Sequence, residues 1–225
     1  MLVLFDIDGT LLTRAGKAHI EALNAAIHEV HAVDPGNLRD QVNPAGRTDG
    51  EIARLVLLAL GVSALRIDER AGDVREACCR VYAQICPRDL SELVVPGMLE
   101  LLAWLGEHEG VTLGLVTGNY EPVARLKLGR AGLGKWFSSA PGGFGSDSED
   151  RAALPAIARR RGGHAPREQT VVIGDTPRDI ACARADGVRC VAVTTGQYAA
   201  DELTGADAVA SDAAELRAHL EAIDI

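Results

Sequence analysis

Short apolar runs recur along the chain, and most of them are separated by amphipathic stretches. The runs that predict strands are Leu2–Phe5, Val111–Val116, Val171–Ile173, Cys190–Val193 and Ala208–Ala210. Between them, apolar residues return at helical spacing, as at Met98, Leu101, Leu102 and Leu105. Strands that alternate with helices predict an α/β fold, in which helices cover both faces of a parallel sheet.

The segment after the first strand is different, because it contains helical patterns and no convincing strand. Its apolar positions are Ile20, Leu23, Ile27 and Val30, followed by Ile52, Leu55, Val56 and Leu60. Parallel sheets bind ligands outside the carboxyl ends of their strands, so a helical insertion at this point is a candidate lid. We therefore expect a core of residues 1–13 and 96–225 and a helical cap of residues 14–95.

Length and charge narrow the possibilities. A chain of 225 residues fits one core domain with an insertion, and a net charge of −9 disfavours nucleic acid and anionic membranes as partners. The sequence begins without a basic leader, and it has no apolar stretch near the roughly 20 residues of a membrane span. Five cysteines, an odd number without a CxxC pair, fit reduced thiols, so we expect a cytoplasmic protein.

Carboxylates follow two of the predicted strands. Asp6 and Asp8 come after the first strand, and Asp175 and Asp179 come after the Val171–Ile173 strand. Crowded carboxylates need a cation or a shared proton, and an all-oxygen cluster without His or Cys favours Mg²⁺ over Zn²⁺. The alternative is that these residues cap turns, with Asp179 placed as a first-turn helix charge.

The second predicted strand ends in Thr117-Gly118-Asn119. A hydroxyl next to free backbone N–H groups suits a phosphoryl group. Thr and Asn are also common helix N-caps, so an ordinary cap is the alternative explanation.

Taken together, the motifs DxDGT from Asp6, TGN from Thr117 and GDTPRD from Gly174 resemble the haloacid dehalogenase superfamily, from Asp6 to about Thr195. The resemblance implies a doubly wound, Rossmann-like core with a helical cap inserted after the first motif. Most members of this superfamily are phosphatases. A carboxylate is a known acceptor for phosphoryl groups, which agrees with that activity.

The resemblance also implies roles for the motif residues. Asp6 would form an aspartyl-phosphate, while Asp8 would protonate the leaving group and then activate water. Thr117 would bind the phosphoryl oxygens together with Gly118 and Asn119. Mg²⁺ would be bound by Asp6, the backbone carbonyl of Asp8 and Asp175, with Asp179 supporting the metal.

The superfamily also places a cation ahead of the last acidic motif. Arg151 is the closest match, although Lys is more usual there, and Lys127 is the second candidate. In the expected cap, Arg47 could reach a substrate anion, and its segment resembles phosphoglycolate-phosphatase-like members. The alternatives are a solvated charge for Arg151 and, beside Arg47, a capping box of Thr48 and Glu51. The run Arg159-Arg160-Arg161 is interpreted as a solvated helix end.

These features predict hydrolysis of a small phosphorylated metabolite, with phosphoglycolate or a sugar phosphate as candidates. A phosphomutase of the β-phosphoglucomutase type shares Asp6 and Asp8 and is the second hypothesis. A noncatalytic phosphometabolite-binding protein is the third. Dehalogenases and phosphonatases depart from the motif at Asp8, which argues against both. The sequence leaves the substrate and the oligomeric state open.

Overall fold

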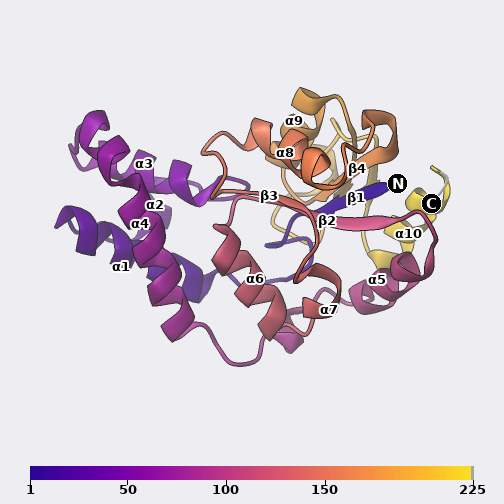
Figure 1. Cartoon of the computed structure of the whole chain (residues 1–225), viewed down its shortest axis with the longest axis horizontal. Helices are drawn as coiled ribbons and strands as arrows, with labels where there is room; N and C mark the ends of the chain where they lie inside the picture. The colour runs from indigo at the N-terminus through magenta and orange to yellow at the C-terminus, as the bar shows by residue number, and fades with distance from the viewer. Residues whose placement is uncertain (224–225) are drawn as a thin grey trace.

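A six-stranded parallel sheet forms the centre of the molecule (Figure 1). The computed structural model describes residues 1–223, apart from the side chains of residues 38 and 39. The strand order is β3-β2-β1-β4-β5-β6. The bounds are β1 Leu2–Phe5, β2 Thr112–Thr117, β3 Gly142–Phe144, β4 Thr170–Gly174, β5 Arg189–Val193 and β6 Ala208–Ala210. The predicted doubly wound α/β fold is confirmed.

The edge strand β3 is not among the strands predicted from the sequence. Its residues Gly142 and Gly143 have low strand propensity, and only Phe144 favours a strand. Pairing with β2 forms the strand instead, with Leu115 opposite Gly142 and Thr117 opposite Phe144. The added strand extends the sheet next to the residues that follow β2.

Helices cover both faces of the sheet (Figure 1). On β1, Leu2 and Leu4 pack into the apolar cluster beneath α8 (Leu154–Arg161) and α9 (Pro177–Asp186), while Val3 and Phe5 belong to the cluster on the other face. Burial on both sides explains why the strand is apolar throughout. The opposite face packs against α5 (Met98–Glu107), α7 (Gly134–Phe137) and α10 (Ala213–Glu221), and α6 (Glu121–Arg130) lies between the sheet and the insertion. Short 3-10 turns occur at Ser91–Leu93, Arg151–Ala153, Arg167–Gln169 and Ala200–Glu202.

The segment between β1 and α5 forms a group of helices beside the core, which we call the helical insertion (Figure 1). It contains α1 (Lys17–His31), α2 (Leu38–Gln41), α3 (Asp49–Ala59) and α4 (Ala64–Ile85). Its two connections to the core run side by side, because Leu12 bridges Val94 and the Thr13 N–H donates to the Leu93 carbonyl at 2.8 Å.

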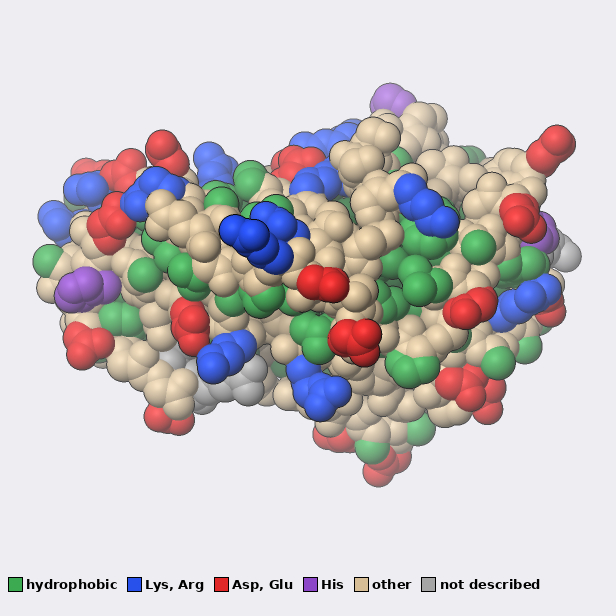
Figure 2. Space-filling model, turned by 90° about the horizontal axis from the view of Figure 1, so that it is seen from below, with side chains coloured by type: hydrophobic (Ala, Val, Ile, Leu, Met, Phe, Trp, Pro, Cys, Tyr) green, Lys and Arg blue, Asp and Glu red, His purple; other side chains and the backbone are tan. Residues whose placement is uncertain are grey.

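The surface mixes both charge signs. On the face shown in Figure 2, Lys and Arg side chains are interspersed with Asp and Glu. The arginine run was predicted to be a solvated helix end, which holds for the exposed residues Arg160 and Arg161 and is wrong for Arg159, which is largely buried. Arg159 pairs with buried Asp186 at 2.6 Å, and Arg161 pairs with Asp147 at 2.7 Å. Among residues 1–223, no helix has the length and apolar character needed to span a membrane.

Candidate active site

Asp6 is the first residue after β1 and is buried at the carboxyl edge of the sheet. Its N–H donates to the Ile173 carbonyl at 2.9 Å, which continues the ladder between β1 and β4 past the end of the strand. The chain then turns at Gly9, whose φ of 93° is strained for any residue with a side chain. A Cβ at Gly9 would also overlap the Asp175 carboxylate. The DxDG spacing therefore positions Asp6 and leaves room for Asp175.

Asp6, Asp175 and Asp179 form a cluster of buried carboxylates, with one oxygen from each within 4.8 Å of the others. Burial raises the pKa of Asp175 to about 8, and the charges of Asp179 and Asp6 act in the same direction. Burial also raises the pKa of Asp6 to about 6, although Arg151 opposes this shift. The oxygen donors and the repulsion between them fit a hard divalent cation.

Asp179 and Arg151 form a buried ion pair next to this cluster. Asp179 is the third residue of α9 and accepts bonds from the N–H and hydroxyl of Thr176, so it is also the first-turn capping residue considered from the sequence. The Arg151 guanidinium additionally lies 3.3 Å from Asp6. Burial alone would lower the pKa of Arg151, but the charges of Asp179 and Asp6 outweigh burial and hold this pKa well above its ordinary value. The guanidinium therefore stays charged. Arg151 is therefore not a solvated charge, and it lies where the first candidate cation was expected.

Asp8 binds the second candidate cation, Lys127. The Lys127 Nζ lies 2.9 Å and 2.7 Å from the two carboxylate oxygens of Asp8, although the two residues are 119 positions apart. Asn119 donates to Asp8 at 3.0 Å and accepts from Lys127 at 2.8 Å. Burial raises the pKa of Asp8, but Lys127, His19 and these hydrogen bonds outweigh it, so the net pKa is below the ordinary value. The site therefore contains two cations, each paired with a different carboxylate.

The TGN segment connects β2 to α6. The N-cap of α6 is Tyr120, without a side-chain bond, so capping does not explain Thr117 or Asn119. Gly118 and Asn119 line the pocket described below. Thr117 is not among the described residues that line this pocket, and its hydroxyl accepts the Asn119 N–H at 3.4 Å. The phosphate-binding role of Thr117 stays a prediction.

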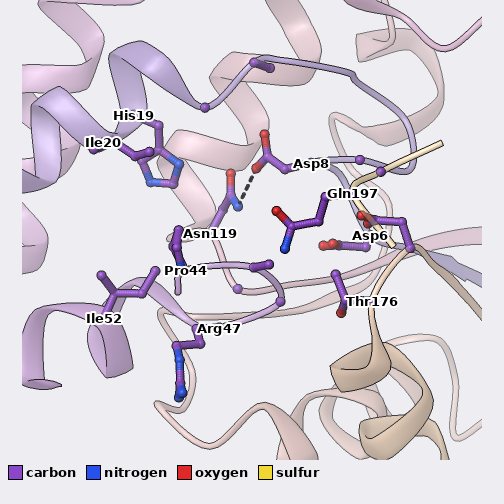
Figure 3. A pocket seen from close by; sticks show the side chains of 18 of the residues that line it. Asp6, Asp8, His19, Ile20, Pro44, Arg47, Ile52, Asn119, Thr176 and Gln197 are labelled. Atoms are coloured by element: carbon purple, nitrogen blue, oxygen red, sulfur yellow. Dashed lines mark hydrogen bonds between the residues drawn. The ribbon is translucent and has the colours of Figure 1, made fainter. Parts of the chain in front are cut away.

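Arg47 is not the free cation that the sequence suggested. It pairs with Glu51, and its Nε donates to the Asn43 carbonyl at 3.1 Å. Thr48 caps α3 as expected by accepting the Glu51 N–H at 3.1 Å. In Figure 3, Arg47 lines the pocket but its side chain points away from Asp6.

A pocket of about 610 Å³ opens between the carboxyl edge of the sheet and the helical insertion. Asp6, Asp8, Asn119 and Gln197 project into it from the core (Figure 3). His19 and Ile52 line it from the insertion. A pocket of this volume is large enough for a small molecule.

Several residues at this site were not identified from the sequence. Thr195 donates to the Gly9 carbonyl at 2.5 Å, and a Cβ at Gly196 would overlap Asp175. His19 and Asp49 form a buried pair at 3.0 Å. Among these residues, Asp49 directly follows Arg47 and Thr48, which were considered from the sequence, but its burial could not be inferred.

Comparison with known proteins identifies the family. The family model described as haloacid dehalogenase-like hydrolase matches residues 3–184. The chain belongs to the haloacid dehalogenase-like hydrolase family. The resemblance inferred from the three motifs is thus confirmed, as is the prediction of an enzyme.

Similar members of the haloacid dehalogenase-like family are phosphatases by name. A phosphoglycolate phosphatase of Rhodospirillum rubrum is 32% identical over 95% of this chain and 88% of its own length. Phosphoglycolate phosphatase 1 of Pseudomonas aeruginosa is 29% identical over 87% of this chain and 70% of its own length. The structure of CbbY from Rhodobacter sphaeroides in complex with phosphate has the same fold, with a TM-score of 0.68, 22% identity and coverage of 96% and 95% of the two chains.

Proposed function

We propose that this protein is a Mg²⁺-dependent phosphatase that hydrolyses a small phosphate monoester through an aspartyl-phosphate on Asp6. The observation that carries the proposal is the convergence of Asp6, Asp175, Asp179 and Arg151 at one end of a pocket. A transferring phosphoryl group needs its negative charge neutralised and its geometry fixed. This cluster has the donors for a metal ion, together with a guanidinium beside the reacting carboxylate.

Mg²⁺ fits the oxygen donors of the cluster. Asp6, Asp175 and the backbone carbonyl of Asp8 would hold it, with Asp179 as a supporting carboxylate. When bound, the ion would neutralise charge on the phosphoryl oxygens. Asp179 is already bound by Arg151 and Thr176, which suits a residue that orients the site.

The reaction proceeds in two displacements at phosphorus. An Asp6 carboxylate oxygen attacks phosphorus while the bond to the leaving oxygen breaks, and Asp8 gives its proton to that oxygen. Asp8 then takes a proton from water as the water oxygen attacks the phosphoryl group, which releases inorganic phosphate and restores Asp6. The lowered pKa keeps Asp8 ionised in the substrate-free site, so the proton that it gives in the first step must first pass to it from the bound phosphate monoester, which enters as the monoanion. After the first step Asp8 is again the carboxylate that accepts a proton from water.

The remaining polar groups bind the phosphoryl oxygens. Arg151 contributes charge from the side of Asp6. Gly118 and Asn119 also line the pocket, next to Thr117. The helical insertion, within residues 14–95, acts as a cap that excludes water from the site on the core of residues 1–13 and 96–225.

The substrate is a small phosphorylated metabolite. Phosphoglycolate and sugar phosphates are the candidates, supported by the names of the relatives and by a pocket of about 610 Å³. Arg47 would contact the substrate only after exchanging Glu51 for a substrate anion. The free cysteines agree with a cytoplasmic, reducing environment.

Phosphate release from para-nitrophenyl phosphate, phosphoglycolate and hexose phosphates tests this function, with Mg²⁺ and with excess EDTA. We expect release only with Mg²⁺, and an Asp6→Asn variant should lose at least about 10³-fold in kcat because it lacks the nucleophile. Asp201→Asn, an exposed carboxylate in the turn at Ala200–Glu202, is the matched control and should keep full activity. Retained activity in Asp6→Asn contradicts the assignment. Interconversion of hexose phosphates without phosphate release indicates a mutase, and tight binding without turnover indicates a binding protein.

A further inference from the structure

A chain of buried polar contacts runs from the helical insertion to Asp8. The Tyr120 N–H donates to the Asp49 carboxylate at 2.7 Å, and the same oxygen lies 3.0 Å from His19 Nε2. His19 Nδ1 lies 3.4 Å from Lys127 Nζ, which in turn binds Asp8. His19 and Asp49 belong to α1 and α3 of the insertion, whereas Lys127 and Tyr120 belong to the core.

The geometry sets the direction of each hydrogen bond. An ammonium only donates, so His19 Nδ1 accepts from Lys127 and the imidazole proton resides on Nε2, where it donates to Asp49. The three donors of Lys127 face four acceptors, which are the two carboxylate oxygens of Asp8, the Asn119 amide oxygen and His19 Nδ1. Lys127 is fully buried, so no water replaces His19 when that contact is lost, and the position of the ammonium is then set by Asp8 and Asn119 alone.

His19 Nδ1 can accept from Lys127 only when the insertion is packed against the core, because the two residues belong to these two parts of the molecule. Asp49 reinforces that packing, because its own N–H donates to the Gly118 carbonyl at 2.8 Å. The His19 ring is further fixed by the edge of Tyr82, with ring centroids 5.6 Å apart. In Figure 3, His19 and Asn119 lie on the same side of the pocket as Asp8. Movement of the insertion therefore changes the bonding of the ammonium that holds Asp8.

We propose that His19 and Asp49 are positioning residues that act through Lys127 to set the place of the Asp8 carboxylate when the insertion is docked. The inference rests on the proposed function, because it assumes that Asp8 transfers protons during phosphate ester hydrolysis. It predicts that substitutions at His19 weaken acid catalysis more than they weaken substrate binding.

Two substrates of nearly the same shape provide the test. The leaving group of para-nitrophenyl phosphate departs readily without a proton, whereas that of phenyl phosphate needs one more strongly. For His19→Leu we expect kcat/KM to fall about 10- to 100-fold with phenyl phosphate, which is less than the roughly 10²–10⁴ that the general acid itself supplies, and several-fold less with para-nitrophenyl phosphate. His19→Asn, which keeps an acceptor near the Nδ1 position, should recover most of the loss.

Two further variants keep the test decisive. His31→Leu makes the same change at another buried histidine of α1, outside the residues lining the pocket, and both substrates should be turned over as by the unaltered protein. If His19→Leu does not fold, Asp49→Asn serves in its place, because it removes the charge behind His19 and keeps an oxygen for Tyr120. The same bias against phenyl phosphate is expected. An equal loss with both substrates, or no loss, overturns the proposal, whereas an unaltered protein that releases phosphate from neither substrate contradicts the proposed function itself.

Discussion

Asp175 combines the two conditions that make a carboxylate sensitive to a cation. Glycines at positions 9 and 196 leave it space, and the charges of Asp6 and Asp179 raise its pKa together with burial. A group with a raised folded-state pKa destabilises the metal-free protein once the pH exceeds its ordinary value, because the unfolded chain ionises more easily. Removing the charge should therefore help the metal-free protein and abolish the response to metal.

Asp175→Asn tests this expectation. At pH 7 without metal, the variant should melt at or above the temperature of the unaltered protein. A Mg²⁺ concentration of about 100 times the dissociation constant should stabilise the unaltered protein by about 2.7 kcal/mol and leave the variant unchanged. Thermal melts with EDTA and with Mg²⁺ measure both effects. An equal Mg²⁺ shift in the two proteins would exclude Asp175 as a ligand.

Arg151 compensates two buried carboxylates, so its loss should be costly. Arg151→Met leaves Asp6 and Asp179 without their cation, and breaking a buried pair in this way typically costs about 3–5 kcal/mol. Arg151→Lys should recover part of this stability and activity, since an ammonium supplies the charge but not the planar guanidinium. Urea unfolding and phosphate release measure the two consequences. Equal behaviour of the Met and Lys variants would show that charge at this position is unimportant.

At the scale of elements, β3 depends on an ion pair that follows it. Asp147 accepts the Phe144 N–H at 3.0 Å and binds Arg161 of α8 through both of its oxygens. Burial raises the pKa of Asp147, but these partners outweigh it and hold the net pKa below the ordinary value. The stabilisation is present above the ordinary pKa of about 3.8 and is lost as the pH falls through the lower folded-state value.

Asp147→Asn should therefore destabilise the protein by about 1 kcal/mol at neutral pH, since the pair is partly exposed. The difference should persist from pH 7 down to about 3.8 and shrink only below that, as the native carboxylate becomes protonated at its lower folded-state pKa. Urea unfolding across this range provides the measurement. A difference that stays constant with pH would mean that the charge of Asp147 does not contribute.

The elements predictable from sequence are those whose own residues favour them. The apolar runs of β1 and β4 and the spacing of α5 required no knowledge of distant partners. In contrast, Gly142 and Gly143 form a strand only because β2 is beside them, and Gly143 also lies against the backbone of Leu154. A Cβ there would overlap the Leu154 carbonyl, so the residues that weaken local strand propensity are the ones that permit the packing.

The same distinction holds for the whole molecule. The motifs located Asp6, Asp8, Asp175 and Asp179, because the topology of a parallel sheet brings strand ends to one edge. The pairing of Lys127 with Asp8 was not predictable, since it depends on how α6 packs beneath the helical insertion. Where the insertion contacts the core, the sequence offers only residue types, and the fold decides which of them meet.

Gly118 is a point where the insertion and the core meet without room for a side chain. A Cβ at Gly118 would overlap the carbonyl of Arg47, which is backbone and cannot rotate away. Gly118→Ala should therefore push residues 47–49 off the core and displace the Asp49 and His19 contacts. Overpacking of this kind costs about 1–3 kcal/mol, and a misplacement of about 1 Å can lower the rate about 10²-fold.

Gly129→Ala is the matched control, because the same methyl group added there on α6 meets open space. It should leave the rate unchanged and add up to about 1 kcal/mol of stability through higher helix propensity. Steady-state kinetics and urea unfolding of both variants separate the effect of a methyl group from the effect of its position. If Gly118→Ala keeps full kcat/KM, activity does not require the close packing of the insertion against the loop after β2, and the coupling from Asp49 to Asp8 must tolerate that displacement.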